Sequence, residues 1–253
     1  MNKIIRIFDL ETTGFDPETA GVCEVAYCEL VSAENDLAGH PINWEVKSGV
    51  EELVNPGYPI PPETSAIHHI IDVDVEGALS LPAVIAAMVD PDFLDVDETV
   101  IAFAAHNAKF ERQWLTPELV GNVPWVCTYK SALRLWPESP RHTNQCLRYW
   151  RNPIGLDRTI ANVAHRAFPD AYVTAFLLRD MLNEGAPLEQ LIEWTGQPAL
   201  QFRCQIGKWR GTPWRDVDYG YLAWVSERDF DEDVIFTVRH EMERRDKEQR
   251  DNA

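Results

Sequence analysis

The sequence lacks the paired cysteines of a zinc site or a disulfide framework, because no two of its five cysteines are spaced as Cys-x-x-Cys. Isolated cysteines favour reduced thiols in a cytoplasmic protein. The sequence also lacks any apolar run near the about 20 residues that span a bilayer. Its first residues predict a strand containing Arg6 and Asp9 instead of a signal peptide. We therefore expect a cytoplasmic protein without membrane contact.

Basic residues are scarce as well, with 23 Lys and Arg against 41 Asp and Glu and a net charge of −18. Taken alone, this excess argues against a polyanionic partner. The bases are concentrated, however, in residues 125–168 and again in residues 199–215, whereas residues 72–98 contain acids and neither Lys nor Arg. A nucleic acid responds to charges within about 8–10 Å. The basic segments are therefore either a local binding surface or ordinary solvated faces.

Hydrophobic periodicity and turn residues predict alternating strands and helices. The predicted strands are Ile4–Leu10, Val22–Val31, Trp44–Val54, Thr99–Ala105 and Trp125–Thr128. The predicted helices are Glu63–His69, Leu81–Asp90, Phe110–Leu115, Lys130–Trp136, Asn144–Trp150, Pro169–Leu182 and Leu188–Trp194. Three early strands followed by mixed helices and strands indicate an α/β domain with a mixed sheet.

Two acids one residue apart, Asp9 and Glu11, end the first apolar strand. Alternate side chains of a strand point to the same face, so these carboxylates lie side by side. Adjacent carboxylates repel each other unless a positive charge lies between them. The pair therefore predicts a divalent metal site, the alternative being two surface acids at a strand end.

Four short segments carry the remaining chemistry: FDLETTG at Phe8–Gly14, SAIHHI at Ser65–Ile70, AHNAKFE at Ala105–Glu111 and HRAFPDA at His165–Ala171. In this order they resemble the DEDDh 3′→5′ exonuclease family, which shares an RNase H-like fold with the proofreading subunits of DNA polymerases. The tail segments IGKWRG and DYGYLAW are similar to the small module that follows exonuclease X-like domains. The resemblance implies an RNase H-like mixed five-stranded sheet flanked by helices, plus a small C-terminal module.

The resemblance also implies a catalytic set of Asp9, Glu11, Glu111, His165 and Asp170. The four acids would hold two divalent cations, Mg²⁺ or Mn²⁺, which prefer oxygen ligands. Asp9 would bridge the cations, and Glu11 and Asp170 would complete the one on the nucleophile side. His165 would accept the proton of the attacking water, a role suited to an unperturbed pKa of about 6.5. For Asp170 the alternative is an acid that complements the helix dipole.

One position departs from the family pattern, because Glu111 stands where the family usually has aspartate. Glutamate is one methylene longer and can still reach a metal or a water beside it. We expect activity to survive with an altered metal preference. The alternative is that Glu111 points to solvent and the second cation is weakly held.

The resemblance further implies contacts to the terminal nucleotide from Leu10, Thr12, Thr13, Ile67, His68, His106, Asn107 and Phe110. Thr12 and Thr13 could instead cap a turn. His68 could be a structural histidine and Phe110 a core residue. His106 and Asn107 are expected to orient their loop in addition to any nucleotide contact.

The sequence suggests three parts: an exonuclease domain at 1–185, a linker helix at 186–200 and an exonuclease X-like C-terminal module at 201–253. In the tail, Lys208 and Arg210 are candidate phosphate contacts, and most tryptophans are expected in a small core. The charged end Arg244–Ala253 is expected to fray.

These observations predict a metal-dependent 3′→5′ exonuclease that hydrolyses DNA to 5′-mononucleotides by a two-metal mechanism, in repair, replication or phage DNA metabolism. Its partner is the 3′ end of single- or double-stranded DNA, with basic residues 125–168 along the path of the strand. One alternative is a 3′→5′ exoribonuclease of the same fold. Others are a catalytically weakened nucleic-acid-binding module and an accessory subunit that docks on replication or repair proteins.

Overall fold

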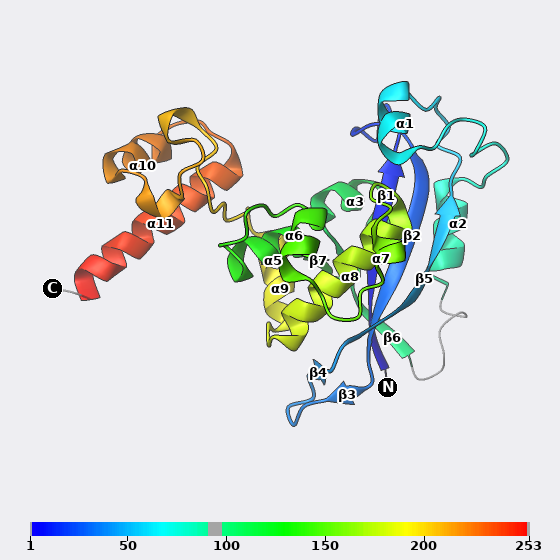
Figure 1. The fold of residues 1–253 in the computed structure, drawn as a ribbon, viewed down its shortest axis with the longest axis horizontal. Coiled ribbons are helices and arrows are strands. Elements are labelled where there is room, and N and C mark those ends of the chain that lie inside the picture. Colours follow the sequence, from blue (N-terminus) through cyan, green and yellow to red (C-terminus); the bar gives the residue numbers. More distant parts are fainter. Residues whose placement is uncertain (1, 91–97, 252–253) are drawn as a thin grey trace.

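The computed structural model describes residues 2–90 and 98–251. One mixed sheet has the strand order β5-β2-β1-β6-β7 (Figure 1). Its strands are β1 (Asn2–Thr12), β2 (Val22–Ser32), β5 (Glu45–Leu53), β6 (Glu98–Ala105) and β7 (Trp125–Cys127). β1 pairs antiparallel with β2 and parallel with β6. The predicted mixed five-stranded sheet is therefore confirmed.

The helices of the sheet domain follow the predicted ranges closely. They are α1 (Pro62–His68), α2 (Leu81–Met88), α3 (Ala108–Trp114), α4 (Pro117–Val120), α5 (Thr128–Leu135), α6 (Asn144–Arg151), α7 (Arg158–Ala161), α8 (Ala167–Asn183) and α9 (Leu188–Gly196). The sequence pattern missed only single-turn helices here, α4 and α7. It also missed the short ladder of β3 (Glu34–Asn35) with β4 (Pro41–Ile42), which lies in the predicted hairpin loop.

The central strand β1 is covered on both faces, which explains its continuous apolar run. Ile5 and Ile7 belong to a core that includes residues of α8, whereas Phe8 and Leu10 belong to a second core with residues of α2 and α3. Helix α8 contacts β1, β2 and β5. Asp9 shares the strand face of Ile5 and Ile7. The alternation therefore places the acids of β1 on the face covered by α8.

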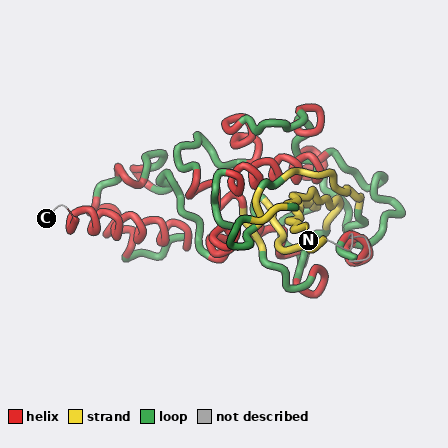
Figure 2. Tube along the Cα trace, turned by 90° about the horizontal axis from the view of Figure 1, so that it is seen from below, coloured by secondary structure: helices red, strands yellow, loops and turns green. Residues whose placement is uncertain are grey.

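The C-terminal residues form a small helical unit at one end of the molecule (Figures 1 and 2). It contains the 3₁₀ turns η2 (Gly207–Trp209) and η3 (Trp214–Asp216) and the helices α10 (Tyr219–Ser226) and α11 (Glu232–Asp251). Its own core includes Cys204, Trp214, Leu222 and Val238. Trp214 is thus a core residue, whereas Trp224 is 42% exposed.

The prediction that the chain frays from Arg244 onward is wrong, because α11 continues to Asp251; residues 252–253 lie outside the described part of the chain. Arg244 forms an ion pair with Glu241 at 2.7 Å. Arg245 donates to the carbonyl oxygens of Trp214, Arg215 and Val217. These contacts tie the charged helix end to the module.

The helix α9 packs into the sheet domain, since Leu191 is fully buried in the core that contains residues of α8. The module is attached just after it, where the Ala199 N–H donates to Asp233 Oδ1 at 2.6 Å and the Gln201 N–H to Thr237 Oγ1 at 2.9 Å. The division of the chain at 185 and 201 remains a prediction. Among the described helices, none combines the length and apolar character needed to cross a bilayer.

Candidate active site

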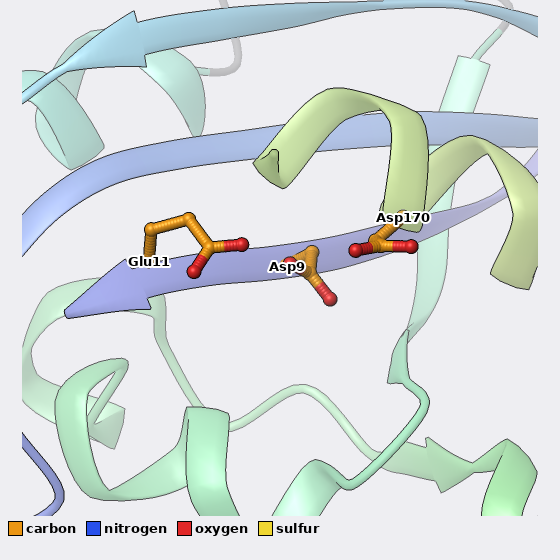
Figure 3. Close-up of side chains that lie close together, drawn as sticks. All are labelled: Asp9, Glu11 and Asp170. Atoms are coloured by element: carbon orange, nitrogen blue, oxygen red, sulfur yellow. The ribbon is translucent and has the colours of Figure 1, made fainter. Parts of the chain in front are cut away.

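Three of the predicted acids meet above β1. Asp9 and Glu11 extend from β1, and Asp170 extends from the first turn of α8, which crosses the same face (Figure 3). One carboxylate oxygen from each lies within 4.8 Å of the others. Residues far apart in sequence thus form one acidic cluster with the spacing of a cation site.

The cluster is electrostatically unfavourable without a cation. Burial, followed by the charges of Asp170 and Glu11, raises the pKa of Asp9 well above its usual value. Burial and then the Asp170 charge raise the pKa of Glu11 to about 8, although Arg166 opposes the shift. A divalent cation bound by oxygen ligands would remove this repulsion, so the residues present fit a hard cation such as Mg²⁺ or Mn²⁺.

Glu111 lies beside the cluster and is buried, with 5% of its surface exposed. The alternative that it points to solvent is therefore wrong. Its Oε2 has no hydrogen-bond partner among the described residues, and burial raises its pKa to about 8. Its charge also contributes to the raised pKa of Asp9. Burying a carboxylate oxygen without a hydrogen-bond partner costs free energy, and a bound cation would offset that cost. Glu111 therefore fits as a ligand of a second cation next to Asp9.

Asp170 is held by three groups around the start of α8. Gln145 Nε2 donates to its Oδ1 at 2.9 Å, and the backbone N–H of His165 donates to its Oδ2 at 2.8 Å. Asn144 Nδ2 donates to its carbonyl oxygen at 3.1 Å. His165 itself is exposed and has a left-handed backbone, with φ of 61°. This conformation is uncommon for a residue with a side chain and marks a constrained turn.

A partly buried ion pair next to this turn involves Glu24, which the sequence pattern marks only as an ordinary strand residue. Glu24 of β2 is paired with Glu11 across the sheet and is completely buried. Arg166 Nε lies 3.0 Å from both carboxylate oxygens of Glu24, and the Ala167 N–H donates to Glu24 Oε2 at 2.9 Å. The pair fastens the segment between His165 and α8 to the sheet. Its partners are 142 residues apart, so local sequence patterns carry no signal for it.

Several residues predicted to contact the nucleotide have internal partners. Thr12 Oγ1 donates to the Gly14 carbonyl, and Thr13 Oγ1 accepts from the Gly21 N–H, so both stabilise the turn after β1. His106 Nε2 donates to the carbonyl of His142 at 2.9 Å, while its Nδ1 lies 3.0 Å from Thr128 Oγ1. Burial lowers the pKa of His106 to about 4. His106 is therefore a neutral residue that orients its loop.

The other predicted contacts differ in exposure. Leu10 is in the core, and His68 is buried and accepts from the Ile70 N–H at Nδ1. Asn107 is exposed, and Ile67 is 49% exposed. Phe110 is partly buried and lies edge to face with Phe15, which is 86% exposed. The exposed members can reach a ligand directly, whereas Leu10 and His68 can act only by shaping the site.

Known proteins resemble the chain over most of its length. The exonuclease family matches residues 7–178. Exodeoxyribonuclease 10 of Escherichia coli (strain K12) is 31% identical over 246 residues, which cover 95% of the chain and 99% of that protein. The DNA polymerase III subunit epsilon of Aquifex aeolicus is 27% identical over 184 residues, or 70% of the chain and 80% of that protein.

A solved structure of exonuclease X in complex with 5′ overhanging duplex DNA has 28% sequence identity and a TM-score of 0.53. The match covers 76% of this chain and 99% of the chain in the exonuclease X structure. A nuclease domain described as a DEDDh family member is 17% identical and has a TM-score of 0.54, which supports the common fold. The matched region contains the second half of β1, α3 and the start of α8, which carry the acids described above. The chain therefore belongs to the exonuclease family.

Proposed function

We propose that this exonuclease is a metal-dependent 3′→5′ enzyme that hydrolyses DNA to 5′-mononucleotides. The observation that carries the proposal is the convergence of Asp9, Glu11 and Asp170, with ligand atoms within 4.8 Å of one another. Two divalent cations about 3.5–4 Å apart activate a water and stabilise the leaving oxygen in this class of hydrolysis. Asp9 would be shared, Glu11 and Asp170 would hold one cation, and Glu111 would hold the other.

His165 is the proposed general base. In hydrolysis the water oxygen bonds to the phosphorus of the terminal nucleotide, while the bond from that phosphorus to the O3′ of the preceding nucleotide breaks. His165 accepts the proton that the water loses, and the products are a 5′-mononucleotide and a shortened strand with a 3′-hydroxyl. Its exposure and the bond from its backbone N–H to Asp170 support this role, because they put the residue next to an acid of the cluster.

DNA is the proposed substrate because the most extensive resemblance reported above is to an exodeoxyribonuclease, and exonuclease X was solved with duplex DNA. An RNA substrate remains the alternative within the same fold. The resemblance to a polymerase subunit supports docking on replication proteins as a further alternative. Burial of Glu111 beside Asp9 argues against a catalytically weakened module.

The direct test uses a 5′-labelled DNA oligonucleotide and an RNA oligonucleotide of the same sequence, each with Mg²⁺ or Mn²⁺ and with or without chelator. We expect the labelled DNA to shorten progressively, only with metal, and faster than the RNA. Asp9→Asn should remove the activity while leaving the fold unchanged by circular dichroism. Equal shortening with chelator would contradict the metal dependence, and faster shortening of the RNA would contradict the substrate assignment.

A further inference from the structure

A groove of about 290 Å³ lies where the sheet domain meets the C-terminal module. One wall is formed by α5 and by the loop before α6, from Ser139 to Thr143. The other wall is formed by the segment from Gln201 to Gln205, which leads into the module. The groove therefore depends on both parts of the chain.

The charge of this groove differs from that of the whole molecule. Among the described residues that line it are Arg141, His142 and Arg203, and none of them is Asp or Glu. The chain as a whole has 41 acids and a net charge of −18. A second groove, between β5 and α2, is lined by Glu51, Glu52, Asp74 and Glu76. Two arginines without an acid beside them in the lining favour an anionic occupant.

The groove is connected to the active site by one short segment. His142 lines the groove, and its carbonyl accepts from His106 Nε2. Thr143 also lines the groove, and the next residue, Asn144, donates to the carbonyl of Asp170. A strand whose 3′ end lies at the acidic cluster thus has the groove as an adjacent path for the nucleotides that precede it.

The cations of the groove are positioned in different ways. Arg203 donates to the carbonyl of Gly211 at 2.9 Å, and its guanidinium lies 5.2 Å from the centre of the Phe202 ring. The Arg141 guanidinium is exposed and forms no ion pair among the described residues. Cations free of carboxylate partners retain their attraction for phosphate groups.

We propose that this groove binds single-stranded nucleic acid on the 5′ side of the nucleotide being removed. The inference rests on the proposed function, because it assigns the active site to the 3′ end of the same strand. Phosphates contact Arg141 and Arg203, one from each wall, so the C-terminal module takes part in holding the substrate. An acidic protein segment would satisfy the charge alone, but it would not explain why the groove adjoins the acidic cluster.

The test uses the full chain with Arg141→Gln and Arg203→Gln combined. The control is Arg239→Gln, which also removes a cation. Arg239 is two residues after Thr237 in α11, so it lies on the helix face opposite the one that meets the sheet domain. Two substrates are compared, a thymidine dinucleotide and a thymidine oligonucleotide of about twelve residues, a length within the range of single-strand sites. KM and kcat are measured from low to high salt.

We expect the double variant to raise KM for the long substrate by about 25-fold at 0.1 M salt, since each lost phosphate contact is worth about fivefold there. The salt slope of log KM should fall by about 1.4, or about 0.7 for each contact. Turnover of the dinucleotide and the thermal midpoint should match those of the Arg239→Gln control. This outcome supports the groove.

An unchanged KM for the long substrate would overturn the groove assignment, and so would an equal loss on both substrates. If the double variant loses binding of an acidic peptide but keeps the KM for the long substrate, the surface belongs to a protein partner instead. Failure of the unaltered enzyme to degrade either substrate would count against the proposed function, which keeps the two conclusions separable.

Discussion

Replacing Glu111 by glutamine should stabilise the metal-free protein, and by more as the pH rises. Burial raises the pKa of Glu111 from 4.5 to about 8 in the folded protein, and its Oε2 has no partner among the described residues. Between these values the unfolded chain is ionised at this position while the folded chain retains the proton. The folded state therefore binds more protons, and stability falls as pH rises through this window.

The size of this stability difference follows from the pKa shift of Glu111. Each pH unit between 4.5 and 8 removes about 1.36 kcal/mol from the stability of the unaltered protein. The accumulated loss is on the order of 3 kcal/mol near pH 6.5 and on the order of 5 kcal/mol above pH 8. Glutamine does not titrate, so the Glu111→Gln variant should avoid this loss.

The assay is urea unfolding in the presence of EDTA, at intervals from pH 4.5 to pH 9. The control is Glu52→Gln on β5, where the side chain is exposed and the substitution should change stability by less than about 0.5 kcal/mol at every pH. Mg²⁺ at about 100-fold excess over Kd should narrow the difference, since it adds about 2.7 kcal/mol to a protein that binds it. A stability difference between Glu111→Gln and the unaltered protein that stays constant with pH would refute the reasoning.

Three further predictions follow from the site and the module. Arg166→Ala should lower the free energy of unfolding in urea by about 3–5 kcal/mol, because it leaves Glu24 buried without its partner. The exposed control Arg158→Ala should lower it by less than about 0.5 kcal/mol. Similar losses for the two variants would contradict the role of the pair. His165→Ala should lower kcat by about 10²–10⁴, and a variant that keeps the kcat of the unaltered enzyme would exclude this residue as the base. Deleting 201–253 should weaken DNA binding in a filter assay more than it slows single-turnover cleavage, whereas unchanged binding would argue against a role for the module.

The elements of the sheet domain were predictable because their signals are local. Apolar runs mark β1, β2 and β6, and proline and glycine mark where helices end, as at Gly185 beyond α8. The acids were predictable for a related reason, because Asp9 and Glu11 share a strand face and the downstream segments follow in a recognisable order. Local spacing and an ordered set of motifs therefore indicated the fold and the cluster.

What the sequence could not predict depends on pairing between distant residues. The ion pair of Glu24 with Arg166 joins residues that are 142 positions apart, so no local spacing connects them. Arg245 looked like part of a charged, frayed end, yet it binds carbonyl oxygens about 30 residues away in the chain. The groove between the sheet domain and the C-terminal module arises in the same way, since its two walls meet only in the folded molecule.

The carboxylate of Asp170 has two roles. Oδ2 accepts the backbone N–H of His165 at 2.8 Å, and Asp170 also belongs to the acidic cluster. If a cation takes Oδ2 in place of the amide N–H, the left-handed turn loses one restraint. Cation uptake and rearrangement of the histidine segment are then linked equilibria, and each favours the other by the same free energy. A nucleic-acid strand that draws His165 toward its terminal phosphate would accordingly raise the affinity of the enzyme for the cation.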